Sequence, residues 1–150
     1  MNTLRKSLRL SWSEWWLLTQ ASVLLPMTAL MLRLTGLRRY KLILSSLASS
    51  DSAPKEDQTE MVLAQALRIS WLVKVAVRYG IYPANCLQRS LVLWWLLHQQ
   101  GIRSELHIGT RKDSGRFEAH AWIEIAGFVL NDTDDVRQRF APFDRPVALS

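Results

Sequence analysis

Hydrophobic positions are distributed differently along the two parts of the chain. Through the first hundred residues they recur at helical spacing, as in residues 60–79, a stretch that ends at Gly80. In the next stretch, residues 86–100, the middle is apolar on every side, which is typical of a central buried helix. After Gly101 the period changes to two, so the following part of the chain predicts strands.

The N-terminal part predicts two helical stretches. Ser11 and Glu14 have the spacing of a capping box, so a helix should begin there and run toward Pro26, and Gly36 should end a second stretch. The longest charge-free run, residues 15–32, is short, contains several polar residues and is interrupted by proline. A spanning helix needs about 20 predominantly apolar residues, so this run favours a packed or interfacial helix.

A polar segment divides the chain. Residues 45–59 contain five serines, one proline and mixed charge, a composition typical of a linker or a long exposed loop. We therefore expect an N-terminal helical extension over residues 1–44, the linker over 45–59, and the main domain over 60–150.

The alternating part predicts a small antiparallel sheet. Strands are expected at residues 103–108, 117–125 and 128–132, with turns at 112–115 and 126–127. Helices followed by hairpin-connected strands indicate an α+β fold, in which the buried helix packs on the sheet.

The charge is confined to one end. The chain carries a formal net charge of +6, and residues 51–150 hold twelve basic and twelve acidic side chains, so the excess lies in residues 1–50. Those residues contain one acid, Glu14, and the following bases: Arg5, Lys6, Arg9, Arg33, Arg38, Arg39 and Lys41. Such asymmetry suggests an acidic partner or a membrane surface, or serves only solubility. No zinc-knuckle spacing or RNA-binding signature is present, which disfavours nucleic acid.

Cys86 is the single cysteine, which excludes a disulfide within the chain. It directly follows Asn85, the expected N-cap of the buried helix. Unpaired backbone N–H groups and the positive end of the helix dipole favour a thiolate there and can stabilise an oxyanion. An ordinary core cysteine is the alternative reading.

The predicted hairpin supplies partners for the cysteine. If strands 117–125 and 128–132 pair about the turn at 126–127, His120 lies opposite Asp132, with the two Cβ atoms about 5 Å apart. A carboxylate at that place can hold the imidazole tautomer and support the imidazolium, as the third member of a catalytic triad does. A slip by one residue would place Asn131 or Thr133 opposite instead.

Other titratable residues are weaker candidates. His98 lies about 18 Å along the helix from Cys86, and His107 faces solvent with its strand neighbours. A zinc site from Cys86, His107 and His120 lacks any standard ligand spacing, so neither a metal nor a cofactor is expected. Asp134 and Asp135 lie beyond the strand and should be solvated.

Several motifs together resemble one family. The matching stretches are Asn85 to Ser90 (NCLQRS), Leu106 to Gly109 (LHIG), Phe117 to Glu124 (FEAHAWIE) and Asn131-Asp132. These residues resemble the lasso-peptide biosynthesis B2 proteins, leader peptidases built on a transglutaminase-like, papain-like core. The resemblance covers about residues 60–135, and the N-terminal helices share only the basic, leucine-rich character of the family.

The resemblance implies a cysteine peptidase that removes the leader from a ribosomally made lasso-peptide precursor. Carried over by motif, Cys86 is the nucleophile, His120 the general base and acid, and Asp132 the orienting acid. An acyltransferase using the same triad, or a non-catalytic scaffold of the maturation complex, remains as an alternative.

The resemblance also implies partners and a location. In the family a leader-binding protein (B1 type) is fused to the peptidase or separate, and the helical signals of residues 1–50 favour the separate type. The freed core passes to an ATP-dependent macrolactam synthetase. We expect a cytoplasmic protein, and the basic N-terminal helices also suit a packed pad, a peripheral membrane contact or a docking site for partners.

Overall fold

The computed structural model describes residues 10–47 and 59–142, and gives only the backbone of residues 37, 38 and 40–47. The elements in chain order are α2 (Trp12–Leu47), α3 (Thr59–Tyr79), α4 (Cys86–Gln99), β1 (Glu105–Asp113), β2 (Arg116–Ile125), β3 (Phe128–Val129), α5 (Val136–Arg139) and β4 (Ala141–Pro142). The predicted linker falls largely on residues 48–58, outside the described residues, and the three-part division of the chain stays a prediction.

Helix α2 begins with the predicted capping box. The backbone N–H of Ser11 donates to Glu14 Oε2 at 2.7 Å, and the N–H of Glu14 donates to Ser11 Oγ at 3.3 Å. The helix continues through Pro26 and changes direction at Gly36, whose φ of 72° lies in the left-handed region. An internal proline removes one hydrogen bond and crowds the preceding turn. Burial of Ala21 and Leu25 beside it offsets that cost.

Helices α3 and α4 confirm the helical pattern of residues 60–100. α3 spans Thr59–Tyr79, one residue from the predicted start at residue 60. Asp57 has the spacing to Glu60 of a capping pair, which predicts the start of this helix, and it lies outside the described residues. α4 spans Cys86–Gln99 behind Asn85 as N-cap, and its apolar middle is buried as predicted. Trp95 alone of residues 91–97 is only partly buried.

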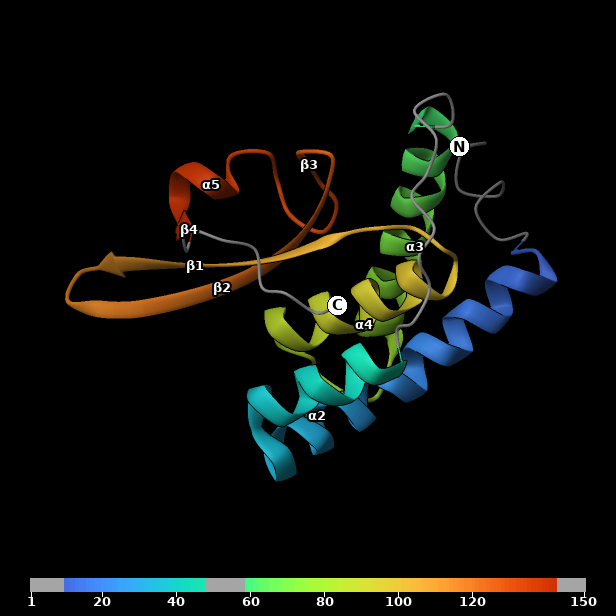
Figure 1. The fold of residues 1–150 in the computed structure, drawn as a ribbon, viewed down its shortest axis with the longest axis horizontal. Helices are drawn as coiled ribbons and strands as arrows, with labels where there is room; N and C mark the ends of the chain where they lie inside the picture. Colours follow the sequence, from blue (N-terminus) through green and yellow to red (C-terminus); the bar gives the residue numbers. More distant parts are fainter. Residues whose placement is uncertain (1–9, 48–58, 143–150) are drawn as a thin grey trace.

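The strands form a four-stranded antiparallel sheet in the order β3-β2-β1-β4. In Figure 1, β1 and β2 make a long hairpin that extends beyond the helices, with α4 on one side of it and α5 on the other. The third strand was predicted over 128–132 and is shorter, Phe128–Val129. Pairing ends there because the N–H of Ile123 donates to Asn131 Oδ1 at 2.8 Å. In a continued ladder this N–H would donate to a backbone carbonyl instead.

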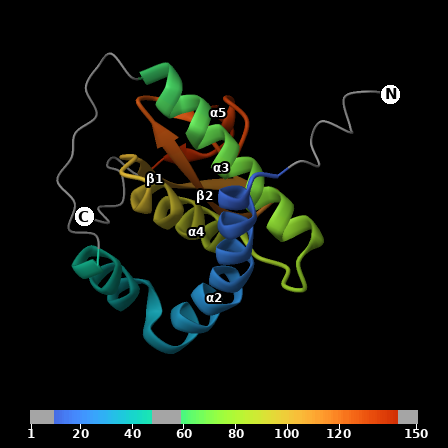
Figure 2. The ribbon, with the colours of Figure 1, turned by 90° about the vertical axis from the view of Figure 1, so that its right-hand side faces the viewer.

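Helix α4 lies at the centre of the molecule. It contacts α2 and α3 as well as strands β1 and β2, and the three long helices gather beside the sheet (Figure 2). The core that includes Leu25 of α2 also contains four fully buried leucines of α4, namely Leu91, Leu93, Leu96 and Leu97. The α+β fold predicted from the sequence is confirmed.

Candidate active site

Cys86 is the first residue of α4, and the loop before it is fixed by a reciprocal cap. The N–H of Gln88 donates to Asn85 Oδ1 at 2.9 Å, and the N–H of Asn85 donates to Gln88 Oε1 at 3.0 Å. These bonds leave the N–H groups of Cys86 and Leu87 without a hydrogen-bond partner among the described residues. Both groups are therefore available to an anion at the helix N-terminus. The cap occupies Gln88 Oε1, and Gln88 Nε2 donates to Tyr82 Oη at 3.4 Å.

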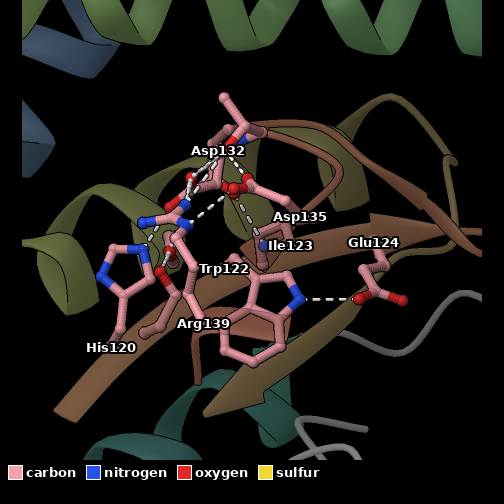
Figure 3. A network of polar contacts seen from close by, with 11 residues as sticks. His120, Trp122, Ile123, Glu124, Asp132, Asp135 and Arg139 are labelled. Carbon is pink, nitrogen blue, oxygen red and sulfur yellow. Dashed lines mark hydrogen bonds and ion pairs between the residues drawn. The ribbon is translucent and has the colours of Figure 1, made fainter. Parts of the chain in front are cut away.

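His120 and Asp132 are in direct contact. His120 Nε2 and Asp132 Oδ2 form a short hydrogen bond, and the other ring nitrogen points away from Asp132 (Figure 3). The imidazole stacks on Phe140, with ring centroids 4.9 Å apart. Phe140 can approach because Gly109, the strand partner of His120, has no Cβ; one added there would lie 3.0 Å from Phe140 Cβ. The histidine ring is thus held by a carboxylate and by aromatic packing.

Asp132 reaches His120 by a different route from the one predicted. The paired residues of β2 and β3 end at Glu124 and Val129, so Asp132 lies beyond the strand and is not a cross-strand partner. The chain instead curls back toward β2. Leu130 anchors this curve: its N–H donates to Ile123 O at 3.0 Å, and its carbonyl accepts from Ser70 Oγ of α3 at 2.9 Å.

Three neighbouring groups lower the pKa of the Asp132 carboxylate against the effect of its burial. Burial alone raises its pKa, but the N–H of Thr133 (2.7 Å), His120 and the Arg139 guanidinium (2.6 Å) outweigh burial and lower the pKa below its ordinary value. Asp132 is therefore a carboxylate at neutral pH, able to accept from the His120 ring. The contact with Arg139, carried by α5, is absent from the sequence prediction.

Cys86 begins the helix that packs against β2, the strand that carries His120. One turn further along α4, Ser90 donates its hydroxyl to the carbonyl of Ala121 at 3.0 Å, and Asn131 Nδ2 donates to Ser90 Oγ at 2.9 Å. Residues four apart share a helix face, so the face that carries Cys86 is fastened to β2 next to His120. The Cys86 thiol itself makes no hydrogen bond to His120 or to any other described residue.

The structure thus joins two of the three predicted site residues directly and brings the third to the adjoining helix. The sequence pattern predicted Asn131 only as a register alternative and predicted no role for Ser90. A signal was present for both, since each is a polar residue inside a motif that carries the family resemblance.

A second carboxylate network lies farther along β2. Glu124 is 1% exposed and accepts from Trp122 Nε1 (2.6 Å) and Arg137 Nε (2.8 Å), with His107 Nε2 at 3.6 Å. Burial raises the pKa of Glu124, but the bonds from Arg137 and Trp122 and the nearby His107 reverse this, and the pKa is lowered. The strand pattern predicted a surface position for His107. In the structure its side chain is only 13% exposed and its ring stacks against Trp122.

The remaining candidates are placed as follows. His98 stacks on Trp94 within α4, with ring centroids 5.2 Å apart, far from the site. Asp135 is exposed and pairs with Arg139 at 3.3 Å. Over residues 10–47 and 59–142, no group of three or more His, Cys, Asp or Glu residues could hold a metal ion.

These contacts define a chemistry. With Asp132 accepting from Nε2–H, the other nitrogen of His120 carries the lone pair and can take up a proton. A thiol, an imidazole held by a carboxylate, and unpaired N–H groups at a helix N-terminus are the kinds of group that acyl transfer through a thioester uses.

Comparison with known proteins agrees with this arrangement. The family model of the transglutaminase-like superfamily matches residues 24–145, more than half of the chain. The chain belongs to the transglutaminase-like superfamily. The match begins within α2 and so includes part of the N-terminal helix as well as the sheet.

One curated relative is similar over a shorter range. The chain is 29% identical over 69 residues to the microcin J25-processing protein McjB of Escherichia coli, which is 46% of this chain and 32% of the relative. The chain thus spans about a third of the length of that protein. The resemblance to the lasso-peptide B2 proteins, predicted from the motifs, is confirmed by these matches. No solved structure matches the chain.

Proposed function

We propose that this protein is a cysteine peptidase that removes the leader from a ribosomally made lasso-peptide precursor. The observation that carries the proposal is the His120–Asp132 hydrogen bond beside a helix that begins at the chain's single cysteine. The similarity to a protein named for microcin J25 processing supports a role in lasso-peptide processing.

In the proposed mechanism, His120 takes the thiol proton of Cys86 and the thiolate attacks the carbonyl carbon at the leader–core junction. The N–H groups of Cys86 and Leu87 stabilise the oxyanion. His120 then gives its proton to the departing amine as the C–N bond breaks, leaving a thioester. Water, deprotonated by His120, attacks the thioester, releases the leader carboxylate and returns the proton to sulfur. Asp132 keeps the imidazole in the required tautomer throughout.

The test is mass spectrometry of the cognate precursor peptide incubated with the protein and a leader-binding partner. Wild type should release leader and core, whereas Cys86→Ala and His120→Ala should lower the rate by about 10³-fold or more. Free leader carboxylate indicates hydrolysis, and an amide or ester adduct would indicate the acyltransferase alternative. Cleavage retained by Cys86→Ala would refute the nucleophile.

Leader recognition is proposed to come from a separate protein of the B1 type. Residues 12–47 form helix, with no strand in that described stretch, whereas the leader-binding module of the family is rich in strands. The freed core would pass to an ATP-dependent macrolactam synthetase. Tight binding of the leader by this chain alone, measured by titration, would contradict the requirement for a partner.

We also infer that α2 rests on an anionic membrane surface. The helical segment Trp12–Gly36 is long and apolar enough to span a membrane by length and composition. Only 17% of its most apolar 18-residue stretch is buried inside the protein. At 100° per residue the large exposed apolar side chains of α2 fall within about 120° of one another and extend for ~33 Å. They are Trp12, Trp15, Trp16, Val23, Met27, Leu30 and Leu34, and we call them the exposed stripe.

The opposite face of α2 argues for contact along the surface rather than insertion across the bilayer. Ala21 and Leu25 are buried in the core, and Glu14 pairs with Arg68 of α3 at 2.5 Å. A helix fixed along its inner face can offer only its outer face to lipid. Tryptophans at one end and the basic excess of residues 1–50 suit an anionic interface.

Vesicle flotation tests this inference. The protein should float with phosphatidylglycerol vesicles and less with neutral ones, and Val23→Glu with Met27→Glu should abolish flotation while leaving thermal unfolding unchanged. No flotation at low salt would eliminate the membrane contact. Loss of partner binding in the same double variant would instead assign the exposed stripe to a protein.

A further inference from the structure

An open groove lies beside the N-terminal end of α4, the helix that begins at Cys86. It has a volume of about 610 Å³, within the range of about 300–1,000 Å³ usual for ligand sites. One wall is α2, with Pro26, Ala29 and Leu30; the other is the start of α4, with Asn85 and Leu87. The latter two residues flank Cys86 in the sequence, and Cys86 itself is not among the residues that line the groove.

The groove is built on fixed elements. α2 is held against the core through Leu25, the residue before Pro26, and α2 contacts α4 directly. On the other wall Asn85 is locked by the reciprocal cap with Gln88. Proline and alanine carry short side chains on the α2 side, so the space between the helices stays open.

The lining indicates the chemistry of the occupant. Pro26, Leu30 and Leu87 make the walls largely apolar. The side-chain oxygens of Asn85 and Gln88 accept the hydrogen bonds of the helix cap, and Gln88 Nε2 donates to Tyr82 Oη at 3.4 Å, so the polar atoms that these two side chains offer to a ligand are N–H donors. Arg33 is the one charged residue among those described that line the groove, and no carboxylate lines it. The groove therefore complements an apolar side chain with an acidic group nearby.

We propose that this groove is a substrate subsite that binds the precursor peptide next to the cut, taking an apolar side chain between α2 and α4 and an acidic side chain at Arg33. The proposal rests on the proposed peptidase function. An extended peptide advances about 3.3 Å per residue, so the residues bound here lie within a few positions of the scissile bond. In this role α2 helps select the substrate besides packing on the core.

The experiment compares a variant that fills the groove with one that does not. Ala29→Trp places an indole in the groove, and Val23→Trp places one on the exposed face of the same helix. Cleavage of the cognate precursor, without lipid and with the leader-binding partner present, should show a KM raised about tenfold or more by Ala29→Trp, with kcat changed less than about twofold. Val23→Trp should match wild type. Equal KM values for both variants would overturn the subsite while leaving the peptidase intact.

A binding measurement separates failure of the subsite from failure of the peptidase. Fluorescein-labelled precursor is titrated, with the partner present, into Cys86→Ala carrying either tryptophan, and anisotropy is recorded. About tenfold weaker binding with Ala29→Trp than with Val23→Trp supports the groove even if wild type cleaves nothing. Equal binding overturns it.

A charge variant covers the case in which Ala29→Trp does not fold. Arg33 is exposed, so Arg33→Glu should leave thermal unfolding unchanged. It should raise KM for the natural precursor about fivefold or more, and a precursor with lysine in place of the acidic residues near the cut should recover it. Absence of both the loss and the recovery would overturn the acidic part of the proposal.

Discussion

Two carboxylate networks lie along β2, and they contain the same kinds of residue. Each is centred on a carboxylate that pairs with an arginine from α5 and lies near a histidine stacked on Trp122. Around Glu124 the carboxylate is 1% exposed and accepts from both Trp122 and Arg137. Around Asp132 the histidine is part-exposed, and one of its ring nitrogens points away from the carboxylate.

The difference shows how the same ingredients serve structure or chemistry. A buried carboxylate saturated with donors is stabilised in a single state and has nothing left for a substrate. The His120–Asp132 pair is partly exposed to solvent, and its histidine lies on the strand against which α4 packs. That histidine can still exchange a proton with another group. Access and an unused ring nitrogen, rather than residue type, distinguish the candidate site from the structural network.

Among the carboxylates and arginines of the two networks, the largest expected effect on cleavage belongs to Asp132. Asp132→Asn keeps the shape but removes the charge that sets the His120 tautomer, so cleavage should fall by about 10²–10⁴-fold. The free energy of unfolding should fall by less than on removing the charge of the buried Glu124, since the side chains of His120 and Asp132 are partly exposed. Single-turnover cleavage with thermal unfolding measures both. Asp135→Asn, a neighbouring exposed carboxylate, is the matched control, and an equal loss there would erase the distinction between the two acids.

Glu124 should behave in the opposite way. Glu124→Gln leaves Trp122 and Arg137 with a weaker acceptor at a buried position, so the free energy of unfolding should fall by about 2 kcal/mol. The cleavage rate at a temperature where the variant is folded should stay within about threefold of wild type. Glu118, on the same strand and paired with Arg111 at the surface, is the control: Glu118→Gln should cost less than about 0.5 kcal/mol. Denaturant unfolding measures both costs.

Acid should weaken both networks. The pKa values of Glu124 and Asp132 are lower in the folded protein than their ordinary values of 4.5 and 3.8, so the unfolded chain binds more protons in acid. The stability that these groups contribute is complete above those values and is lost as the pH falls below them. Unfolding followed from pH 7 to pH 2 should show this loss. Glu124→Gln and Asp132→Asn should each flatten the curve, and an unchanged slope would contradict the assigned shifts.

The smallest effect is expected at Arg139. Its guanidinium is 37% exposed and supports Asp132 from the solvent side. Arg139→Gln should lower the cleavage rate about two- to fivefold, because Asp132 still holds His120. Arg137→Gln should reverse the pattern, reducing stability with little effect on rate. If both arginine variants affected rate equally, the two networks would be one functional unit.

The sequence predicted the local elements because their signals are short-range. The capping residues Ser11 and Asn85, the apolar middle of α4 and the turn at Ala126-Gly127 all appear where the pattern placed them, and both turn residues have positive φ. Cys86 at a helix start and His120 on a strand followed from the same patterns. Spacing and periodicity suffice for such features, since each depends on neighbours within a few residues.

The contact between His120 and Asp132 was predicted for a wrong reason. The predicted register required a strand as far as residue 132. Pairing instead ends at Val129, and the curve of the chain after Leu130 places the Asp132 carboxylate against His120. Asn131 ends the strand pairing, because its side-chain oxygen accepts from the N–H of Ile123 and its Nδ2 donates to Ser90 Oγ. Such a clamp joins three separate segments, and no local pattern encodes it.

The sequence by itself determined the helices, the hairpin, the residue types of the candidate site and the family resemblance. Only the tertiary structure decided which carboxylate is buried and which faces a usable histidine, because burial depends on what α5 and β1 place over β2. It also decided that one apolar face of α2 is covered and the other exposed. Hydrophobicity alone makes those two faces look alike, and only packing against α3 and α4 distinguishes them.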